Sequence, residues 1–261
     1  MIRLAVAGAT GQTGSRVVQW AARHPEFKLV AALAAESDPR MGQPAVPDDP
    51  TVLLADDTDA AYDVLIDFST PAGTVQWCGR TFQAGAAFVS GTTGLSDEQQ
   101  LVLHVAAEKV PVLWAANFSV GINLLLRTVG PVARELGADF DVEIVEAHHT
   151  RKVDAPSGTA LALGKTIAEA TGRSLEADAI HGRSGSVGPR PKGQIGFHAL
   201  RLGDEVGRHE IHFGGPGETL VLQHTVRSRD TFARGALVAA HWLVRQKPAL
   251  YSMQDMLAAA K

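Results

Sequence analysis

Two adjacent histidines and two cations stand just before a predicted helix start in the segment Glu146-Ala-His-His-Thr-Arg-Lys-Val-Asp-Ala-Pro-Ser-Gly-Thr-Ala160. Histidine titrates near neutral pH and can serve as a general acid. Ser157 is placed to cap the helix, which leaves the amides of Gly158 and Thr159 at its positive end, where an anion binds well. With Lys152 close by in the chain, the segment is either a solvated basic turn or a site where a small anion is held and given a proton.

The histidines do not predict a metal site. His148 and His149 point to opposite sides if the chain is extended there, so at most one of them faces a given ligand. His209 and His212 fall on opposite faces of their predicted strand, and we interpret both as structural or surface residues. A zinc site needs three or four converging ligands, and we find none with the usual spacing. Cys78 lies inside a predicted helix and is interpreted as a small core residue, so we expect neither a metal nor a cysteine nucleophile.

A glycine-rich turn follows the predicted N-terminal strand. Gly8, Gly11 and Gly14 stand between a strand at 2–7 and a helix at 15–24. Glycines at such a turn let the backbone approach a pyrophosphate and present helix amides to it. The spacing Gly-x-x-Gly-x-x-Gly departs from the commoner Gly-x-Gly-x-x-Gly, so a merely structural tight turn is the alternative. The strand, turn and helix together favour a dinucleotide-binding site.

The choice of coenzyme depends on the tip of the second strand, about 20 residues beyond the turn, where a carboxylate would bind the ribose 2′-hydroxyl of NADH. That place holds Ala34 and Ala35, while Glu36 lies slightly too far along and Arg40 is the nearest basic residue. The tip therefore lacks a carboxylate that would repel the 2′-phosphate of NADPH. We therefore expect NADPH to be accepted at least as well as NADH.

The first half of the sequence predicts a doubly wound, mostly parallel sheet of the α/β class. Its short apolar strands are expected at residues 2–7, 28–33, 64–68, 88–90 and 111–115. Ser69-Thr-Pro71 and the capping box Ser96-Asp-Glu-Gln99 mark helix starts between them, the first of a helix at 71–84. In open sheets of this kind, ligands bind at the carboxyl ends of the strands.

The pattern changes near residue 119. Four further strands, each near glycine-rich punctuation, are expected at 142–147, 195–202, 209–213 and 219–226. With one long helix at 158–170, they predict a second α+β unit with a mostly antiparallel or mixed sheet. Residues 173–193 contain so many glycines and prolines that we expect a long irregular loop there. An apolar helix at 232–244 closes the chain.

Composition restricts the class of partner. The 261 residues are 45% hydrophobic and 20% charged, with a net charge of -4, which gives no basic surface for nucleic acid or an anionic membrane. A small-molecule partner is expected instead. A single cysteine fits a reducing compartment, and we find neither a signal peptide nor an apolar run long enough to span a bilayer. We therefore expect a cytoplasmic protein.

The segment 145–160 closely resembles the signature of the dihydrodipicolinate reductase family, enzymes of the diaminopimelate route to lysine. Five more segments resemble that family in its order, and the resemblance extends over nearly the whole chain. They are Asp67-Phe-Ser-Thr-Pro71, Gly91-Thr-Thr-Gly-Leu95, Ala115-Ala-Asn-Phe-Ser-Val-Gly121, Gly193-Gln-Ile-Gly-Phe197 and Ser228-Arg-Asp-Thr-Phe-Ala-Arg-Gly-Ala236.

The resemblance implies an oxidoreductase that transfers a hydride from NADPH or NADH to an unsaturated cyclic imine dicarboxylate and then protonates the resulting enamine. The overall reaction converts 4-hydroxy-tetrahydrodipicolinate to tetrahydrodipicolinate. It also implies a Rossmann-like dinucleotide-binding domain of residues 1–118 with 230–261, and a substrate-binding and oligomerisation domain of residues 119–229. The family further implies a homotetramer.

Residue roles carry over from the family by position. His148 is the proton donor, Lys152 with His149 holds the substrate, and Gly158 and Thr159 bind a substrate carboxylate. The residues expected to contact the cofactor lie in three loops and are Gly8, Ala9, Thr10, Gly11, Gln12, Thr13, Gly91, Thr92, Thr93, Ala115, Ala116, Asn117 and Phe118.

Two features keep alternatives open. The glycine turn by itself also resembles atypical short-chain dehydrogenases, some of which bind NAD(P) as redox sensors without turnover. A semialdehyde dehydrogenase shares the turn but needs a nucleophilic cysteine on a loop, which Cys78 does not provide. The acidic and basic residues that usually follow the second strand in the resembled family are Ala34 and Ala35 here, which affects coenzyme preference but not the chemistry.

Overall fold

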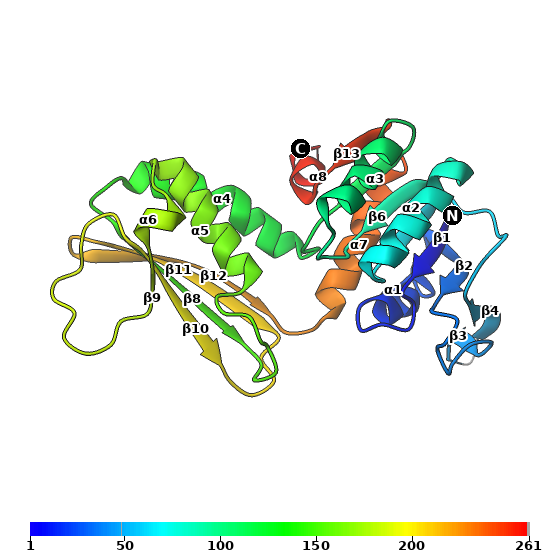
Figure 1. Cartoon of the computed structure of the whole chain (residues 1–261), viewed down its shortest axis with the longest axis horizontal. Helices are drawn as coiled ribbons and strands as arrows, with labels where there is room; N and C mark the ends of the chain where they lie inside the picture. Colours follow the sequence, from blue (N-terminus) through cyan, green and yellow to red (C-terminus); the bar gives the residue numbers. More distant parts are fainter. Residues whose placement is uncertain (48, 260–261) are drawn as a thin grey trace. The chain divides into compact units, whose positions relative to one another are not determined.

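A computed structural model describes residues 1–47 and 49–259 of the chain. The chain divides into two compact units, one formed by Met1–Val120 with Arg229–Lys261 and the other by Gly121–Ser228 (Figure 1). Each unit has its own sheet and its own apolar core.

The first unit is built on a sheet with the strand order β13-β7-β6-β5-β1-β2-β4-β3. Its strands are β1 (Ile2–Ala7), β2 (Phe27–Leu33), β3 (Pro44–Val46), β4 (Asp49–Ala55), β5 (Val64–Asp67), β6 (Ala87–Ser90), β7 (Pro111–Trp114) and β13 (Ala249–Tyr251). All neighbours pair in parallel except β3 and β4. The chain continues from β1 to β2 on one side and later places β5 on the other, so the carboxyl end of β1 is the switch point at which such sheets bind ligands.

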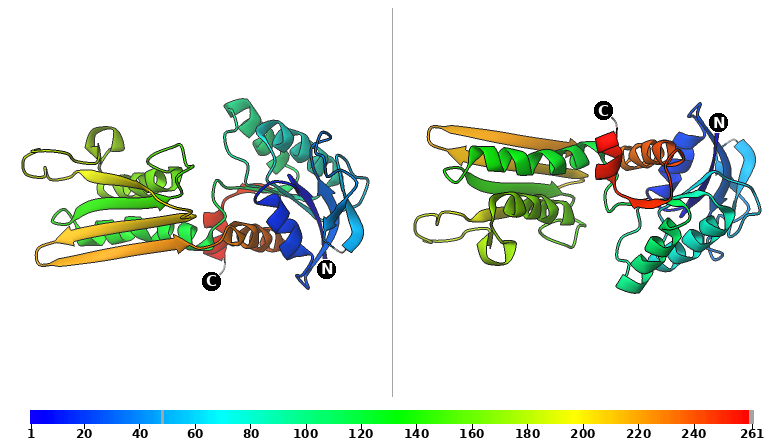
Figure 2. Two further views of the ribbon diagram at one scale, coloured as in Figure 1. Left: turned by 90° about the horizontal axis from the view of Figure 1, so that it is seen from below. Right: turned by 90° about the horizontal axis from the view of Figure 1, so that it is seen from above.

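Helices cover both faces of this sheet, as Figure 2 shows. They are α1 (Gly14–Ala21), α2 (Pro71–Ala84), α3 (Asp97–Ala107), α7 (Asp230–Leu243) and α8 (Met253–Ala259). Helices α1, α7 and α8 bury their apolar residues in one core, and α2 and α3 bury theirs in the other. Local sequence accounts for the starts of α2 and α3, because Thr70 caps α2 ahead of Pro71 and Ser96 with Gln99 forms a capping box on α3.

The second unit has a sheet with the order β12-β11-β8-β10-β9. Its elements are α4 (Val120–Leu136), β8 (Asp141–His148), α5 (Gly158–Thr171), α6 (Leu175–Asp178), β9 (Ala179–His181), β10 (Ile195–Arg201), β11 (Gly207–Gly215) and β12 (Glu218–Val226). Helices α4 and α5 cover one face of the sheet and share a core with it (Figure 1). Most residues of β12 are exposed.

The second unit has the mixed sheet that was one of the two predicted alternatives, and it differs from the sequence prediction in two ways. Its sheet is mixed, because β10 pairs in parallel with both β8 and β9 while β11 is antiparallel to its neighbours. The loop predicted at 173–193 contains α6 and β9, since β9 gains its hydrogen bonds from β10 and needs no strong strand pattern of its own. Helix α4 was not predicted. It contains Pro131, which disfavours a helix interior, but packing of Ile122 and Val129 into the core stabilises it.

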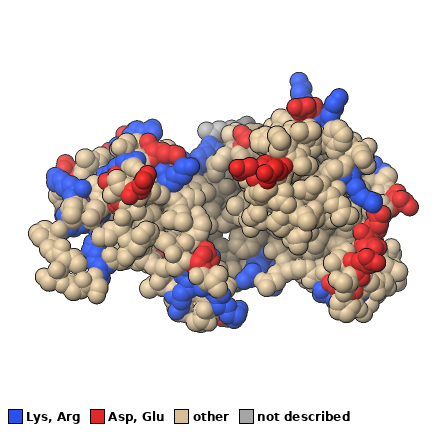
Figure 3. All heavy atoms as spheres, in the orientation of Figure 1, with Lys and Arg blue, Asp and Glu red and all other residues tan. Residues whose placement is uncertain are grey.

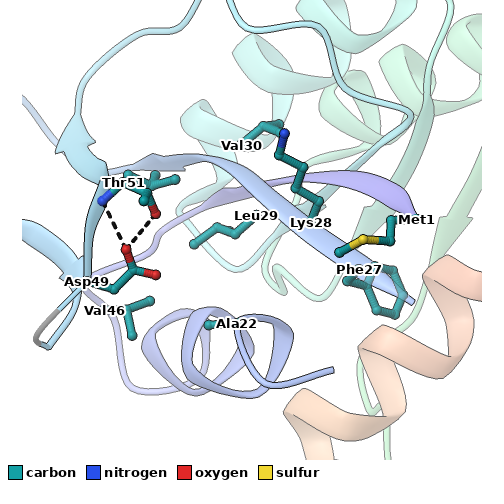
Figure 4. A pocket seen from close by; sticks show the side chains of 10 residues that line it. Met1, Ala22, Phe27, Lys28, Leu29, Val30, Val46, Asp49 and Thr51 are labelled. Atoms are coloured by element: carbon teal, nitrogen blue, oxygen red, sulfur yellow. Dashed lines mark hydrogen bonds between the residues drawn. The ribbon is translucent and has the colours of Figure 1, made fainter. Parts of the chain in front are cut away.

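On the face drawn in Figure 3, acidic and basic side chains are interspersed. Within the residues that the structure describes, no helix is long and apolar enough to cross a membrane. A hollow of about 530 Å³ opens between β2 and β4, lined in part by Phe27, Leu29 and Val52 (Figure 4). It forms because these strands pair only near their carboxyl ends and separate toward the start of β2, and it contains none of the predicted site residues.

Candidate active site

The glycine turn at the end of β1 has the geometry that a dinucleotide pyrophosphate requires. Gly8 has a φ of 72°, and a Cβ there would collide with the carbonyl of Phe68. A Cβ at Gly14 would likewise collide with the carbonyl of Gly8, so the turn closes only with glycines. The amides of Gln12 and Thr13 donate to no backbone carbonyl among the described residues. Helix α1 also begins without a side-chain cap, so a phosphate fits at its positive end.

Two more loops at the same edge of the sheet are joined by one buried carboxylate, Asp67 at the end of β5. Its Oδ2 accepts hydrogen bonds from the hydroxyls of Ser90 (2.8 Å) and Thr92 (3.0 Å). The hydroxyl of Thr74 also donates to Oδ2 (2.6 Å), and the hydroxyl of Ser69 donates to Oδ1 (2.5 Å). Asp67 therefore fixes the loop that contains Gly91, Thr92 and Thr93. Asp67 begins the motif Asp67-Phe-Ser-Thr-Pro71, but the sequence alone indicates no role for it.

The third predicted cofactor loop, Ala115 to Phe118, follows β7 and is tied to its neighbour. The amide of Ala115 donates to the carbonyl of Ser90 (3.1 Å), and the indole of Trp114 donates to the carbonyl of Thr92 (2.9 Å). Phe118 is buried, and Gly235 of α7 is so close to its carbonyl that a Cβ would not fit. The glycine turn, the loop after β6 and the loop after β7 thus all lie at the carboxyl ends of strands in the first unit.

The loop after β2 also reaches the glycine turn, which the sequence did not indicate. Ala34 and Ala35 follow the strand, but further on Arg40 folds back and donates from Nη2 to the carbonyl of Thr10 (3.2 Å). The carboxylate of Asp38 accepts from Nε (2.9 Å) and Nη2 (2.8 Å) of Arg40. An acidic and a basic side chain therefore stand beside the glycine turn although neither occupies the expected position at the strand tip.

In the second unit, His148 ends β8 and contacts the buried carboxylate of Glu146. Its Nδ1 lies 2.5 Å from Oε2 of Glu146, and Glu146 is 1% exposed. Residues two apart on a strand face the same side, which brings the two together. Burial raises the pKa of Glu146, but hydrogen bonds from Arg201 and His148 outweigh it, so the pKa is lowered and the group is a carboxylate. His148 therefore has Nδ1–H donating to Glu146, and its Nε2 is the atom that can exchange a proton.

Arg201 and Ser157 complete the surroundings of that carboxylate. Arg201 donates from Nη2 to Oε1 (2.8 Å) and from Nη1 to Oε2 (2.9 Å) of Glu146. The amide of Ser157 also donates to Oε1 (3.1 Å). One carboxylate thus joins the predicted proton donor to the first turn of α5. Gly207 lies against the ring of His148, where a Cβ would stand 3.2 Å from Nε2, so its missing side chain leaves room at the reactive nitrogen.

His209 lies beside His148 and is buried, with ring centroids 5.2 Å apart. The hydroxyl of Ser157 accepts from the amide of Ala160 (3.2 Å) and lies 3.1 Å from Nε2 of His209, to which it can donate. Burial, followed by the nearby charge of His148, lowers the pKa of His209 to about 4, so the ring is neutral at neutral pH. The sequence had assigned His209 no role in the site, because the pairing of β11 with β8 that brings it there leaves no local signal.

The predicted substrate residues follow in the same segment. Lys152 is 20% exposed, and its Nζ donates to both carboxylate oxygens of Asp154 (2.7 and 2.9 Å). Gly158 begins α5 and is exposed, and a Cβ there would meet nothing within 4 Å. The protein's own packing therefore does not require glycine at this position. His149 and Thr159 are half-buried on either side of this turn.

A doubly wound sheet with a glycine turn at the end of its first strand, together with a second unit that holds a histidine–carboxylate pair beside a helix start, is typical of a two-domain oxidoreductase that uses a nicotinamide nucleotide. Sequence comparison identifies the family. The model described as "Dihydrodipicolinate reductase, N-terminus" matches residues 2–118, and "Dihydrodipicolinate reductase, C-terminus" matches residues 121–257. The chain belongs to the dihydrodipicolinate reductase family.

Individual relatives agree with this assignment. A 4-hydroxy-tetrahydrodipicolinate reductase of Nitrosomonas eutropha is 44% identical over 263 residues, covering 98% of each chain. That of Hahella chejuensis is 42% identical over 269 residues, covering 98% of this chain and 99% of the relative. A solved structure, a dipicolinate-bound dihydrodipicolinate reductase from Paenisporosarcina sp. TG-14, superposes with a TM-score of 0.76 at 27% identity over 97% of both chains.

More distant structures share the fold alone. An amine dehydrogenase from Mycobacterium smegmatis has a TM-score of 0.62 at 14% identity, covering 97% of this chain and 95% of its own. The family resemblance and the α/β fold predicted from the sequence are thereby confirmed. The comparisons also favour a reductase over a redox sensor without turnover.

Proposed function

We propose that this chain catalyses the reduction of 4-hydroxy-tetrahydrodipicolinate to tetrahydrodipicolinate at the expense of NADPH or NADH. The observation that carries the proposal is the contact between His148 and buried Glu146 directly beside the first turn of α5. This arrangement offers a proton and an anion site within one short segment. A cyclic dicarboxylate that must gain a proton needs both.

His148 is proposed to donate the proton. Ionised Glu146 accepts the Nδ1–H bond and thereby fixes the ring orientation, so Nε2–H points away from the carboxylate. Arg201 keeps Glu146 ionised and immobile, which makes both of them positioning residues that need not touch the substrate. The space left by Gly207 gives Nε2 access to a ligand.

Lys152, His149, Gly158 and Thr159 are proposed to hold the substrate. A carboxylate at the start of α5 would interact with the positive end of the helix, and the absence of a side chain at Gly158 allows close approach. The Lys152 ammonium, now paired with Asp154, would supply a second positive charge by exchanging that partner for substrate.

The family and the Rossmann-like unit imply a nicotinamide nucleotide, which supplies the hydride when bound. Its pyrophosphate is proposed to lie on the turn of Gly8, Ala9, Thr10, Gly11, Gln12 and Thr13. The loops of Gly91, Thr92 and Thr93 and of Ala115, Ala116, Asn117 and Phe118 are proposed to contact its remaining parts. Support comes from their common place at the carboxyl ends of β1, β6 and β7.

Assembly and location are also proposed. Strand β12, at the edge of the second sheet, exposes apolar side chains that include Leu220 (40%) and Val221 (42%), and we expect a homotetramer that buries this strand. The scattered surface charge and the single buried cysteine are compatible with a cytoplasmic enzyme. Light scattering on the eluting protein would test the assembly, and a monomeric mass at micromolar concentration would contradict it.

The activity is tested by generating the substrate with an upstream synthase from pyruvate and aspartate semialdehyde and following the loss of NADPH or NADH absorbance. His148→Gln should lower kcat by roughly 10²-fold or more because the proton donor is gone, while dinucleotide affinity stays unchanged. His212→Gln is the matched control, since His212 also pairs with a glutamate, Glu210 (2.9 Å). No consumption by the wild type above the blank would refute the reductase proposal, and full activity of His148→Gln would refute the role of His148.

A further inference from the structure

The side chain of Arg40 comes back to the glycine turn from a loop that starts with two alanines. The loop is shaped by a hydrogen bond from the amide of Asp38 to the carbonyl of Ala35 (2.8 Å). Arg40 then places Nη2 at 3.2 Å from the carbonyl of Thr10, inside the turn itself. In dinucleotide-binding sheets, the adenosine ribose lies between the first glycine turn and the end of the second strand, which is the place that Arg40 borders.

Asp38 holds this guanidinium in place. Besides the two side-chain bonds, its Oδ1 accepts from the amide of Arg40 (3.0 Å). These bonds, with one from Thr10, hold the pKa of the Asp38 carboxyl well below its usual range. The Asp38 side chain is 11% exposed, whereas that of Arg40 is 50% exposed. The carboxylate is therefore already engaged, and the outward-facing group of the pair is the cation.

We infer that Arg40 recognises the 2′-phosphate of NADPH and so replaces, from further along the loop, the basic residue that is missing at Ala35. The inference rests on the proposed dinucleotide site. Within the described residues, Nη1 of Arg40 makes no hydrogen bond, so the guanidinium can donate to a phosphate without leaving Asp38. Arginine suits this role because its planar group matches phosphate oxygens and stays charged.

The same pair explains why NADH need not be excluded. The guanidinium of Arg40 can also donate to the oxygen of a ribose 2′-hydroxyl, so the site does not reject NADH. The carboxylate of Asp38 is already paired with Arg40, so it does not demand a hydroxyl partner. Arg40 thus adds affinity for the phosphate without making it essential.

The test is direct binding, measured by calorimetry with NADPH, NADH, adenosine 2′,5′-bisphosphate and 5′-AMP. Arg40→Ala should weaken NADPH and the bisphosphate by at least about tenfold and leave NADH and 5′-AMP within about twofold. Arg3→Ala is the matched control, because Arg3 is 47% exposed and also paired with an aspartate, Asp63, but sits at the opposite end of β1. It should change none of the four affinities.

Two results would overturn the inference. Equal weakening of all four ligands in Arg40→Ala would show that Arg40 only supports the glycine turn, and unchanged binding would show that another group reads the phosphate. Neither result requires turnover. If either result refutes the role of Arg40, the reductase proposal remains intact. If the wild type fails to reduce the substrate but Arg40→Ala selectively weakens NADPH binding, the reductase proposal is refuted and the role of Arg40 remains.

Discussion

Helices α1 and α5 both begin where we expect a ligand anion, but their first turns are constructed from different groups. The turn before α1 consists of glycines and open amides, and no side chain caps the helix. Helix α5 has Ser157 as its cap, and the amide of Ser157 is held by the buried carboxylate of Glu146. The first site therefore depends on backbone shape, and the second depends on a few charged side chains whose positions are fixed by each other.

This difference determines which substitutions matter. At the glycine turn, the backbone conformation depends on Gly8 and Gly14, where a Cβ cannot be accommodated. At the start of α5, backbone shape tolerates change, as the open space at Gly158 shows, but loss of one charge disturbs several groups. Substitutions at Gly8, Glu146 and His209 test this contrast.

Gly8→Ala should cause the largest effect. The added methyl group would meet the Phe68 carbonyl in a backbone conformation with φ of 72°, so we expect a loss of about 3 kcal/mol or more in the free energy of unfolding. Gly42→Ala is the control, because Gly42 has a φ of 76° but nothing within 4 Å of an added Cβ. It should cost only about 1–2 kcal/mol, the strain of the left-handed backbone. Denaturant unfolding of both variants measures the difference, and equal losses would show that the turn is less tightly closed than described.

Sequence reasoning was most successful where local signals and burial agree. The helix predicted at 71–84 matches α2, since its cap, its proline and its C-terminal glycine are all local. The central strands β1, β2, β5, β6 and β7 of the first sheet were recognised because strands buried on both faces form continuous apolar runs, whereas β3, β4 and β13 were not predicted. Helix α4 and strand β9 were missed because tertiary packing and pairing, rather than propensity, stabilise them.

The candidate site shows the same limit. His148 and Lys152 could be chosen from residue type and from the helix start behind them. Glu146 could have been found as well, because a carboxylate two residues before a histidine on a strand faces the same side. Arg201 contacts Glu146, 55 residues away in the sequence, because β10 pairs with β8. No local sequence pattern predicts that contact.

Glu146→Gln tests the charged site and should have the next largest effect. The amide keeps the shape but no longer fixes Nδ1–H of His148, and it leaves Arg201 without a carboxylate. We expect kcat to fall by roughly 10²-fold, comparable to about 2.7 kcal/mol, with a changed pH profile and unaltered NADPH binding. Glu143→Gln is the control, because Glu143 lies on the same strand as Glu146 and also pairs with two arginines and a histidine, His198 of β10.

The outcome separates positioning from simple support of the fold. Glu143→Gln should leave kcat within a few-fold even if it lowers stability. If both variants lost the same stability and the same activity, Glu146 would contribute only to folding. Retained activity with a normal pH profile in Glu146→Gln would refute its role in orienting His148.

His209 should give the smallest effect, seen in stability rather than turnover. Its pKa is lowered by burial to about 4 in the folded chain, against an ordinary value of about 6.5 when unfolded. Between these values the unfolded chain binds more protons, so stability falls as the pH drops through this window, by about 2 kcal/mol near pH 4.5. His209→Gln can still accept from Ser157 and does not titrate, so its unfolding free energy should vary less over the same window. Because burial also lowers the pKa of His224, the matched variant His224→Gln removes that contribution, and His209→Gln must flatten the profile more than His224→Gln does. An unchanged pH dependence in His209→Gln would mean that the pKa of His209 is the same in the folded and the unfolded chain, and the lowering of that pKa by burial would then be wrong.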